Sequence, residues 1–311
     1  MKTAFVFPGQ GSQYVGMGKD FYDNYPIAKN IFDKSEKILG INMKELCFDG
    51  PMEELSLTEI TQPAILTTSY AILKVLEDKG LKAEVTAGLS LGEYTALVYT
   101  EAIDFEDAVK LVKSRGKYMQ ETVPAGEGKM AALIEMSIED TNKLINDIKN
   151  EGIIEVANYN CPGQIVISGE ARVVEKASKL AKEYGAKKSV ILPVSAPFHS
   201  SLLKPAGDKL ENDLKNIDIK SMNCDLISNV TGDYVVEEDV KELLKKQVYN
   251  SVYWQQSIER MLNDGVTRFI EIGPGKSLST FIKKISRKHK IKVEIKKIEN
   301  IKDLDSIDSI N

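Results

Sequence analysis

Hydrophobic and polar positions alternate along the first 125 residues in blocks that are typical of an α/β protein. Residues 3–7 form an apolar run that ends in a Gly-rich turn, as a buried strand does. A second short strand is predicted at 83–88. Apolar residues at helical spacing, with Asp104 as an N-cap, predict helices at 27–39, 62–79, 91–99 and 105–122.

The pattern changes near residue 125, where Pro and Gly residues interrupt the chain. The next segments read as strand, helix, two strands, helix and strand, at 130–135, 138–149, 153–157, 164–168, 171–184 and 188–193. This βαββαβ order is the ferredoxin-like unit. We therefore expect a small domain at 126–196, inserted into a larger α/β domain formed by 1–125 and 197–311.

After the insertion the alternation of helices and strands resumes. Helices are predicted near 237–247 and 254–264, then a strand at 268–272, a Gly-Pro-Gly turn and a last helix. Strands that alternate with helices favour a mostly parallel sheet. The polar run 303–311 is predicted to fray.

Composition excludes several classes of protein. With 41 Lys+Arg against 46 Asp+Glu, the net charge of −5 gives no overall attraction to nucleic acid or an anionic membrane. The three cysteines share no CxxC spacing and cannot all pair, so a secreted disulfide framework is not expected. No run reaches the roughly 18 apolar residues of a membrane span, and Pro8 interrupts the N-terminal apolar stretch. These features predict a soluble, cytoplasmic protein.

Residues 88–92, Gly-Leu-Ser-Leu-Gly, match the G-x-S-x-G pattern between a predicted strand and a predicted helix. A sharp turn there lifts the Ser90 hydroxyl above the sheet, and the helix N-terminus behind it presents N–H groups to a developing oxyanion. The motif by itself is a weak signal, since small-residue turns also cap helices. Its position between strand and helix favours a nucleophile.

A serine nucleophile needs a base, and the chain has two histidines, which also excludes a His-rich metal site. His289 lies in a charged stretch and is expected to face solvent. His199 lies in a Pro-containing loop where the inserted unit ends, and it is the better candidate for the base. No acidic residue stands out as a third member, so a Ser–His dyad and a triad both remain open. The Gly clusters at 9–11 and 273–277 lack the spacing of nucleotide-binding loops and are predicted to be turns.

Several short motifs occur together in one order, and they extend from residue 7 to about 284. They lie at 7–13, 61–64, 88–94, 115–120, 160–164, 197–199, 247–250, 254 and 271–276. In these motifs the chain resembles the malonyl-CoA:acyl-carrier-protein transacylases of type II fatty acid synthesis. The resemblance implies an α/β-hydrolase-like domain with a ferredoxin-like insertion, in agreement with the pattern above.

The resemblance also implies roles for individual residues. Ser90 is the acylated nucleophile, and His199 is the general base and later the acid. The backbone carbonyl of Gln247 orients that histidine in place of a carboxylate. The backbone N–H groups of Gln10 and Leu91 form the oxyanion hole.

Substrate-binding residues follow from the same resemblance. Arg115 binds the malonyl carboxylate, for which a planar guanidinium is suited. Asn160 and Phe198 also match substrate-binding positions, and phenylalanine at 198 is evidence against a methylmalonyl preference. One position departs from the family pattern, because Leu89 stands where a histidine usually precedes the nucleophile. The covalent mechanism is expected to survive this change, whereas any role of that imidazole in substrate positioning is in doubt.

The resulting hypothesis is a ping-pong transfer of malonyl from malonyl-CoA to the thiol of acyl carrier protein by a monomer, with no metal or redox cofactor. Lysine pairs are candidates for docking the acidic carrier, at Lys187, Lys188, Lys283 and Lys284. A serine thioesterase or esterase would have the same sharp turn at Ser90 between strand and helix, the nucleophile elbow, but it would release free acid to water. A non-catalytic acyl-CoA-binding homologue and a transacylase serving polyketide synthesis in trans are further alternatives.

Overall fold

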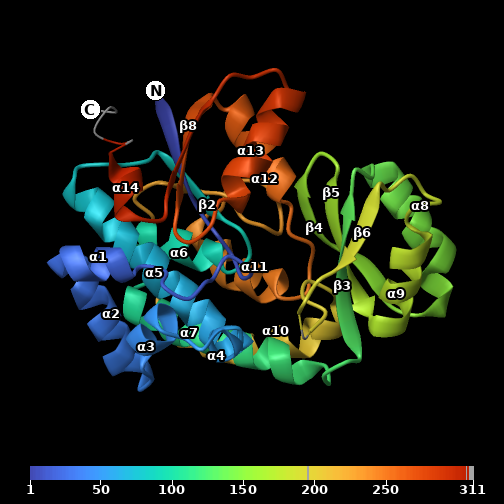
Figure 1. The fold of residues 1–311 in the computed structure, drawn as a ribbon, viewed down its shortest axis with the longest axis horizontal. Coiled ribbons are helices and arrows are strands. Elements are labelled where there is room, and N and C mark those ends of the chain that lie inside the picture. Colours follow the sequence, from blue (N-terminus) through green and yellow to red (C-terminus); the bar gives the residue numbers. More distant parts are fainter. Residues whose placement is uncertain (195, 306, 308–311) are drawn as a thin grey trace.

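The computed structural model describes residues 1–194, 196–305 and 307. Its larger sheet has five parallel strands in the order β7-β2-β1-β8-β9. These strands are β1 (Lys2–Phe7), β2 (Val85–Gly88), β7 (Asp225–Leu226), β8 (Val266–Ile272) and β9 (Glu294–Ile298). Figure 1 shows helices on both sides of this sheet. The predicted α/β class with a mostly parallel sheet is thereby confirmed.

Helices of the larger unit form two groups. Before the insertion they are α1 (Lys19–Asn24), α2 (Pro26–Leu39), α3 (Met43–Phe48), α4 (Met52–Leu55), α5 (Thr58–Asp78), α6 (Gly92–Tyr99) and α7 (Phe105–Thr122). After it they are α10 (Lys204–Lys215), α11 (Val240–Gln247), α12 (Trp254–Asn263), α13 (Ser277–Lys288) and α14 (Ile301–Leu304). Short 3₁₀ turns occupy Lys149–Glu151, Ser201–Leu203 and Glu237–Asp239.

The central strand β1 is buried on both faces because its side chains alternate between two apolar cores. Phe5 and Phe7 pack in a core with residues of α2, α5 and α7. Ala4 and Val6 face the opposite way, into a core with residues of α12 and α13. This continuous apolar run is what the sequence pattern at 3–7 reflects.

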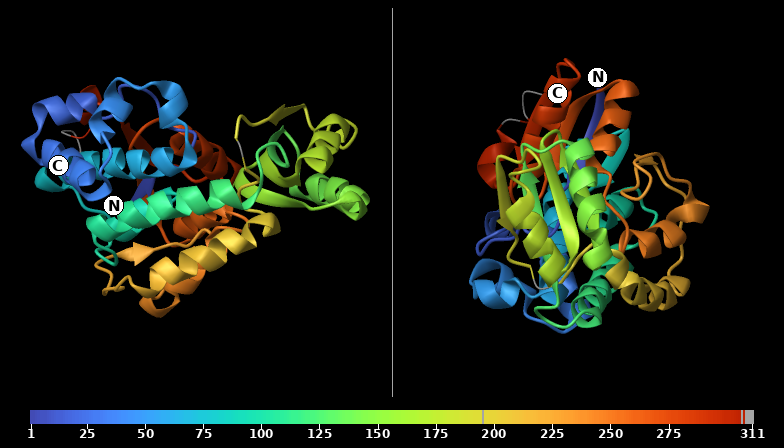
Figure 2. Two further views of the ribbon diagram at one scale, coloured as in Figure 1. Left: turned by 90° about the horizontal axis from the view of Figure 1, so that it is seen from below. Right: turned by 90° about the vertical axis from the view of Figure 1, so that its right-hand side faces the viewer.

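The inserted unit has four antiparallel strands in the order β4-β5-β3-β6, which is the ferredoxin-like order. Its elements are β3 (Gly128–Ile134), α8 (Ile138–Ile148), β4 (Ile154–Cys161), β5 (Gln164–Glu170), α9 (Ala171–Leu180) and β6 (Lys188–Ile191). Both helices cover one face of this sheet, and the unit projects from one end of the parallel-sheet body (Figure 2). Ala131 and Leu133 pack toward the helices, whereas Met130 and Ala132 face a cavity.

Some predicted bounds and elements were wrong. The strand predicted at 153–157 continues to Cys161, and the helix predicted at 171–184 ends at Leu180. Strand β9 and helix α10 were not predicted, because the partly buried sequence Glu294–Ile298 has no clear alternation and α10 follows prolines that suggest a loop. None of the described helices has the length and apolar character that a membrane span requires.

The prediction that 303–311 frays was wrong for the part that the structure describes. Helix α14 is held by a capping box between Asn300 and Asp303. Leu304 and Ile307 are buried in the larger core. Apolar burial fixes this segment despite its polar sequence. The rest of the predicted run, at 306 and 308–311, lies outside the described residues.

Candidate active site

Ser90 lies in the turn between β2 and α6, at the carboxyl end of the parallel sheet. Its backbone φ of 53° is in the left-handed region that non-glycine residues seldom adopt. A Cβ atom added to Gly88 would lie 1.8 Å from the carbonyl carbon of Gly92, and one on Gly92 would lie 2.1 Å from the carbonyl oxygen of Phe7. Both flanking positions therefore require glycine for the turn to pack.

His199 is buried in the loop after β6, and its imidazole joins Ser90 to α11. Nε2 lies 2.8 Å from Oγ of Ser90, and Nδ1 lies 2.8 Å from the backbone oxygen of Gln247. Because a carbonyl oxygen can only accept, Nδ1 carries the ring proton and Nε2 accepts the proton of the Ser90 hydroxyl. The imidazole is thus oriented as a free base toward the serine.

Electrostatics keep that imidazole neutral. Burial lowers the pKa of His199 to about 3, and the positive charge of Arg115 acts in the same direction. No carboxylate of the described residues contacts the imidazole. The geometry is therefore that of a Ser–His dyad, with a backbone carbonyl in the place of a triad carboxylate.

Arg115 of α7 brings a buried positive charge to the same serine; its side chain is 1% exposed. Nη2 donates to Oγ of Ser90 and to Oε1 of Gln247, each at 3.0 Å, and Nη1 donates to Oε1 of Gln62 at 2.8 Å. The guanidinium also lies 5.3 Å from the centre of the Tyr94 ring. Its Nε–H has no hydrogen-bond partner in the described part of the chain. A charged, partly unsatisfied donor group beside the nucleophile is suited to an anionic ligand.

Loop residues after β1 face the elbow from the other side. A Cβ on Gly9 would lie 2.3 Å from the carbonyl oxygen of Leu89, so the two backbones are in close contact. The backbone N–H groups of Gln10 and Leu91 make no hydrogen bond among residues 1–194, 196–305 and 307. Unpaired N–H groups on two adjoining backbones beside a serine can receive an oxyanion.

A cavity of about 950 Å³ surrounds these groups, between the parallel-sheet body and the inserted sheet. Phe198, Asn160 and Leu89 line it. Oδ1 of Asn160 is buried without a hydrogen-bond partner among the described residues, so it can accept a hydrogen bond from a ligand. The apolar Leu89 side chain occupies the wall next to the nucleophile.

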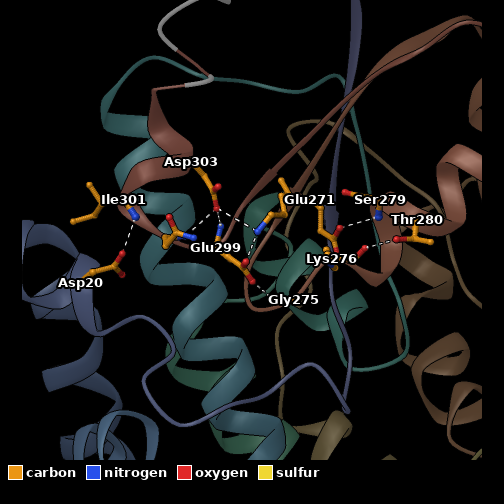
Figure 3. A network of polar contacts seen from close by, with 11 residues as sticks. Asp20, Glu271, Gly275, Lys276, Ser279, Thr280, Glu299, Ile301 and Asp303 are labelled. Carbon is orange, nitrogen blue, oxygen red and sulfur yellow. Dashed lines mark hydrogen bonds and ion pairs between the residues drawn. The ribbon is translucent and has the colours of Figure 1, made fainter.

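Another wall of the cavity is the start of α13, which contributes Ser277, Leu278 and Phe281. The buried carboxylate of Glu271, at the end of β8, accepts the backbone N–H groups of Leu278 at 3.1 Å and Ser279 at 2.8 Å. Figure 3 shows Glu271 beside Ser279 and Lys276 at this helix start, with Glu299 next to Gly275. Two acceptor bonds to the N-terminus of a helix fix the wall to the sheet.

Comparisons with known proteins agree over nearly the whole chain. The sequence model of the acyl transferase domain matches residues 4–304. The malonyl CoA-acyl carrier protein transacylase of Bacillus subtilis (strain 168) is 50% identical over 291 residues, which is 93% of this chain and 92% of that protein. The chain belongs to the malonyl CoA-acyl carrier protein transacylase family.

Solved structures of transacylases have the same fold. The malonyl CoA-acyl carrier protein transacylase from Clostridium perfringens has a TM-score of 0.95 at 50% identity, covering 100% of this chain and 97% of that one. A malonyl-transacylase solved in complex with a type II polyketide acyl-carrier protein has a TM-score of 0.96 at 37% identity, covering both chains completely.

The four lysines predicted to dock a carrier lie on the surface of this transacylase, outside the dyad. Lys187 forms an ion pair with Glu135 at 2.8 Å, and Lys188 begins the edge strand β6. Lys283 and Lys284 are exposed on α13, which packs against β4. The pairs therefore lie on the inserted sheet and on the helix that lines the cavity.

Sequence reasoning missed three polar residues of this transacylase site, namely Gln62, Glu93 and Asn229. The amide oxygen of Asn229 accepts the backbone N–H of Ser90 at 2.5 Å, and its amide nitrogen donates to the oxygen of Gly88 at 2.7 Å. Gln62 and Glu93 fall inside the motifs at 61–64 and 88–94, so a signal existed for them. Asn229 lies in no motif, and only the fold brings it to the elbow.

The transacylase's described residues contain no group of three or more His, Cys, Asp and Glu side chains that could hold a metal ion. His289, the other histidine, is partly exposed and contacts Glu259 at 2.8 Å.

Proposed function

We propose that this protein transfers a malonyl group from malonyl-CoA to the phosphopantetheine thiol of acyl carrier protein through a malonyl-Ser90 intermediate. The observation that carries the proposal is the position of a buried guanidinium, from Arg115, 3.0 Å from the same hydroxyl that contacts the His199 base at 2.8 Å. A nucleophile with both a base and a fixed cation is suited to an acyl group that ends in a carboxylate. The 50% identical relative from Bacillus subtilis is a malonyl CoA-acyl carrier protein transacylase, which supports the same reaction.

In the first half-reaction, His199 Nε2 takes the proton of Ser90 as Oγ bonds to the thioester carbonyl carbon. The negative charge that develops on the carbonyl oxygen is received by the N–H groups of Gln10 and Leu91. The backbone carbonyl of Gln247 accepts the hydrogen bond from Nδ1–H and so stabilises the imidazolium. Collapse of the tetrahedral intermediate breaks the C–S bond, and the imidazolium returns its proton to the leaving CoA sulfur.

The second half-reaction reverses these steps with the carrier. The phosphopantetheine thiol gives its proton to His199, and its sulfur bonds to the carbonyl carbon of malonyl-Ser90. The Ser90 oxygen then leaves and regains the proton from His199. The phosphopantetheine belongs to the carrier, so the proposal includes no cofactor held by this chain.

Arg115 is the residue proposed to select the malonyl group. A carboxylate could satisfy its unpaired Nε–H and replace the weaker bond to the Ser90 hydroxyl. Phe198 and Asn160 are proposed to bound the acyl site from the cavity wall. The apolar Leu89 side chain offers no hydrogen bond there, so recognition of the carboxylate depends on Arg115.

The carrier is proposed to approach the cavity between β6 and α13, where Lys187, Lys188, Lys283 and Lys284 provide local positive charge on a net-negative protein. A polyketide carrier is a second candidate partner, since one similar transacylase was solved in complex with such a carrier. The monomeric state, the cytoplasmic location and the domain boundaries at 125/126 and 196/197 stay predictions.

The experiment mixes the enzyme with malonyl-CoA alone and measures the mass of the peptide that contains Ser90. We expect addition of one malonyl group, lost again when carrier protein is added and recovered on its thiol. Free malonate in place of malonyl-carrier would identify a thioesterase, and an unlabelled serine would identify a non-catalytic acyl-CoA binder. Parallel reactions with a fatty acid carrier and a polyketide carrier distinguish the two partner classes.

Replacing Arg115 by Ala tests the selectivity. Hydrogen bonds to a charged group contribute about 1.5–3 kcal/mol, so malonyl transfer should fall about 10- to 150-fold relative to acetyl transfer. The measurement is kcat/KM for both acyl-CoA donors. Equal losses with both donors would refute the role assigned to Arg115.

A further inference from the structure

Glu93 is a buried carboxyl group at the active site to which the proposed transfer assigns no role. It lies on α6 one turn after Ser90, and its side chain is 2% exposed. Oε2 accepts the Nε2–H of Gln247 at 2.6 Å and the backbone N–H of Asn229 at 3.1 Å. A carboxyl group buried this deeply is costly unless its bonds serve the fold or the site.

Gln247 contacts this carboxyl group and also Ser90, His199 and Arg115. Its Nε2 donates to Glu93 and to the backbone oxygen of Ser90 at 3.0 Å, while its Oε1 accepts from Arg115 at 3.0 Å. Its backbone oxygen contacts His199 at 2.8 Å. Since a carboxylate and a carbonyl both only accept, they fix the amide with its nitrogen toward them and its oxygen toward Arg115. Glu93 therefore helps to determine that the guanidinium of Arg115 donates to the amide oxygen of Gln247.

Charge gives Glu93 a second effect on Arg115. The guanidinium has no ion-pair partner among the described residues, and it is buried. Glu93 is the carboxyl group whose charge acts on it, through the single amide of Gln247. In a buried site such a charge is weakly screened, so the ionised Glu93 offsets part of the field that Arg115 presents to an anion.

We propose that Glu93 is a positioning residue for acyl selection: through the Gln247 amide it orients Arg115 and sets how strongly that guanidinium favours a carboxylate-bearing acyl group. This inference rests on the proposed function. It assigns the selectivity to a three-residue chain, Glu93–Gln247–Arg115, in which Glu93 contacts neither the substrate nor the nucleophile's oxygen.

The ionisation of Glu93 gives the proposal a pH signature. Burial raises its pKa to about 7, against the hydrogen bonds from Gln247 and Asn229 and the charge of Arg115. The titratable groups facing it are Arg115 of α7 and Tyr94 of α6; the contacts from α11 and from residues 228–229 are neutral. Above about pH 7 the carboxylate offsets Arg115, and below it the neutral acid does not. Malonyl preference should therefore rise as the pH falls.

The test measures kcat and KM for malonyl-CoA and acetyl-CoA, as separate donors, from about pH 6 to about pH 8. For the wild type we expect the malonyl-to-acetyl ratio of kcat/KM to fall roughly three- to tenfold over this range. Glu93→Gln keeps an acceptor oxygen for Gln247 and Asn229 but has no charge, so its ratio should stay at the low-pH value throughout. Glu93→Ala releases the amide, and its ratio should drop about tenfold at every pH.

Glu84→Gln is the control, since Glu84 is also a carboxylate that accepts a backbone N–H group, that of Thr3 at 2.8 Å, but it lies outside the cavity and the Arg115 contacts. It should keep the pH slope of the wild-type ratio. A Glu93→Gln ratio with the wild-type slope, or equal loss of both donors in Glu93→Ala, would overturn the proposal. If Glu93→Ala does not fold, the slope of Glu93→Gln decides alone. Failure of wild-type Ser90 labelling would instead refute the proposed function.

Discussion

Ser90 and His199 each hold a backbone φ in the left-handed region, at 53° and 58°. Such conformations cost roughly 1–3 kcal/mol each and persist where the surrounding fold determines them. Here the strain coincides with the two side chains that meet at 2.8 Å. A neutral imidazole whose Nδ1 proton is held by a carbonyl can act as a base without a carboxylate.

Replacing His199 by Ala should slow acylation of Ser90 by roughly 10²- to 10⁴-fold, because general-base catalysis contributes about that much. The measurement is the rate of malonyl addition to Ser90 by rapid-quench mass spectrometry. His289→Ala is the matched control and should acylate at the wild-type rate, since it lies outside the cavity. Near-normal acylation of His199→Ala would show that the base lies elsewhere.

Among the elements, the β2–α6 turn and the loop after β1 are fixed by backbone contacts that leave no room for side chains. Gly92 allows α6 to begin against the carbonyl oxygen of Phe7, and Gly9 allows the loop to touch Leu89. These approaches bring Gln10 and Leu91 together at the carboxyl ends of neighbouring strands, where ligands bind in open α/β sheets. The proposed oxyanion hole thus depends on element packing.

Gly92→Ala should lower both stability and acylation, because a Cβ there would lie 2.1 Å from the oxygen of Phe7. Overpacking of this kind costs about 1–3 kcal/mol or more, measured as the free energy of unfolding in urea. Gly80→Ala is a control with φ of 85° and no atom within 4 Å, so it should cost only about 1 kcal/mol and keep acylation. Equal effects of the two changes would contradict the packing argument.

At the scale of the whole molecule, the cavity lies between two sheets of different kinds. The parallel sheet supplies the elbow through β2 and α6, while β3, β4 and β5 of the inserted sheet supply the opposite wall. Lys188 lies on β6 with Lys187 just before it, and Lys283 and Lys284 lie on α13, the helix that lines the cavity. Substitutions of the surface lysines can therefore change malonyl transfer to the carrier protein without changing the acylation of Ser90 by malonyl-CoA.

Charge reversal tests this separation. Changing Lys187, Lys188, Lys283 and Lys284 to Glu should raise KM for the carrier roughly tenfold and weaken its salt dependence, because local attraction to an acidic partner is lost. Labelling of Ser90 by malonyl-CoA should change less than twofold. Reversal of Lys79 and Lys82, which are exposed between α5 and the start of β2, is the control. An unchanged carrier KM would remove the four lysines from the docking surface.

Two buried groups of the site, His199 and Glu93, give opposing contributions to the pH dependence of stability. The pKa of His199 is about 3 when folded and about 6.5 when unfolded, so the unfolded chain binds more protons and stability falls as the pH drops from 6.5 to 3. The pKa of Glu93 is about 7 when folded and 4.5 when unfolded, so stability rises as the pH drops from 7 to 4.5.

Glu93→Gln removes the rise in stability that protonation of Glu93 gives as the pH drops. From pH 7 to about pH 5 this variant should therefore lose more stability than the wild type, by up to about 1.4 kcal/mol per pH unit. Thermal and urea unfolding at several pH values measure the difference. A variant that follows the wild-type curve would show that Glu93 does not titrate in this range.

Much of the fold could be predicted because its signals are local. The strand at 3–7, the helices at 27–39 and 105–122 and the βαββαβ order each follow from side-chain periodicity within one segment. Strand β9 could not be predicted, since its residues are only partly buried and it pairs with β8 as an edge strand. The order β7-β2-β1-β8-β9 likewise has no local signal.

By itself, the sequence determined the fold class, the elbow at Ser90 and the choice of His199 over His289, because glycine spacing and a count of two histidines can be read along the chain. Only the tertiary structure decided how the surrounding groups contact them. Arg115, Glu93, Asn229 and Gln247 come from separate elements, and their contacts at 2.5–3.1 Å arise when those elements pack. The orientation of the Gln247 amide and the neutral state of His199 are products of burial, which no spacing of residues records.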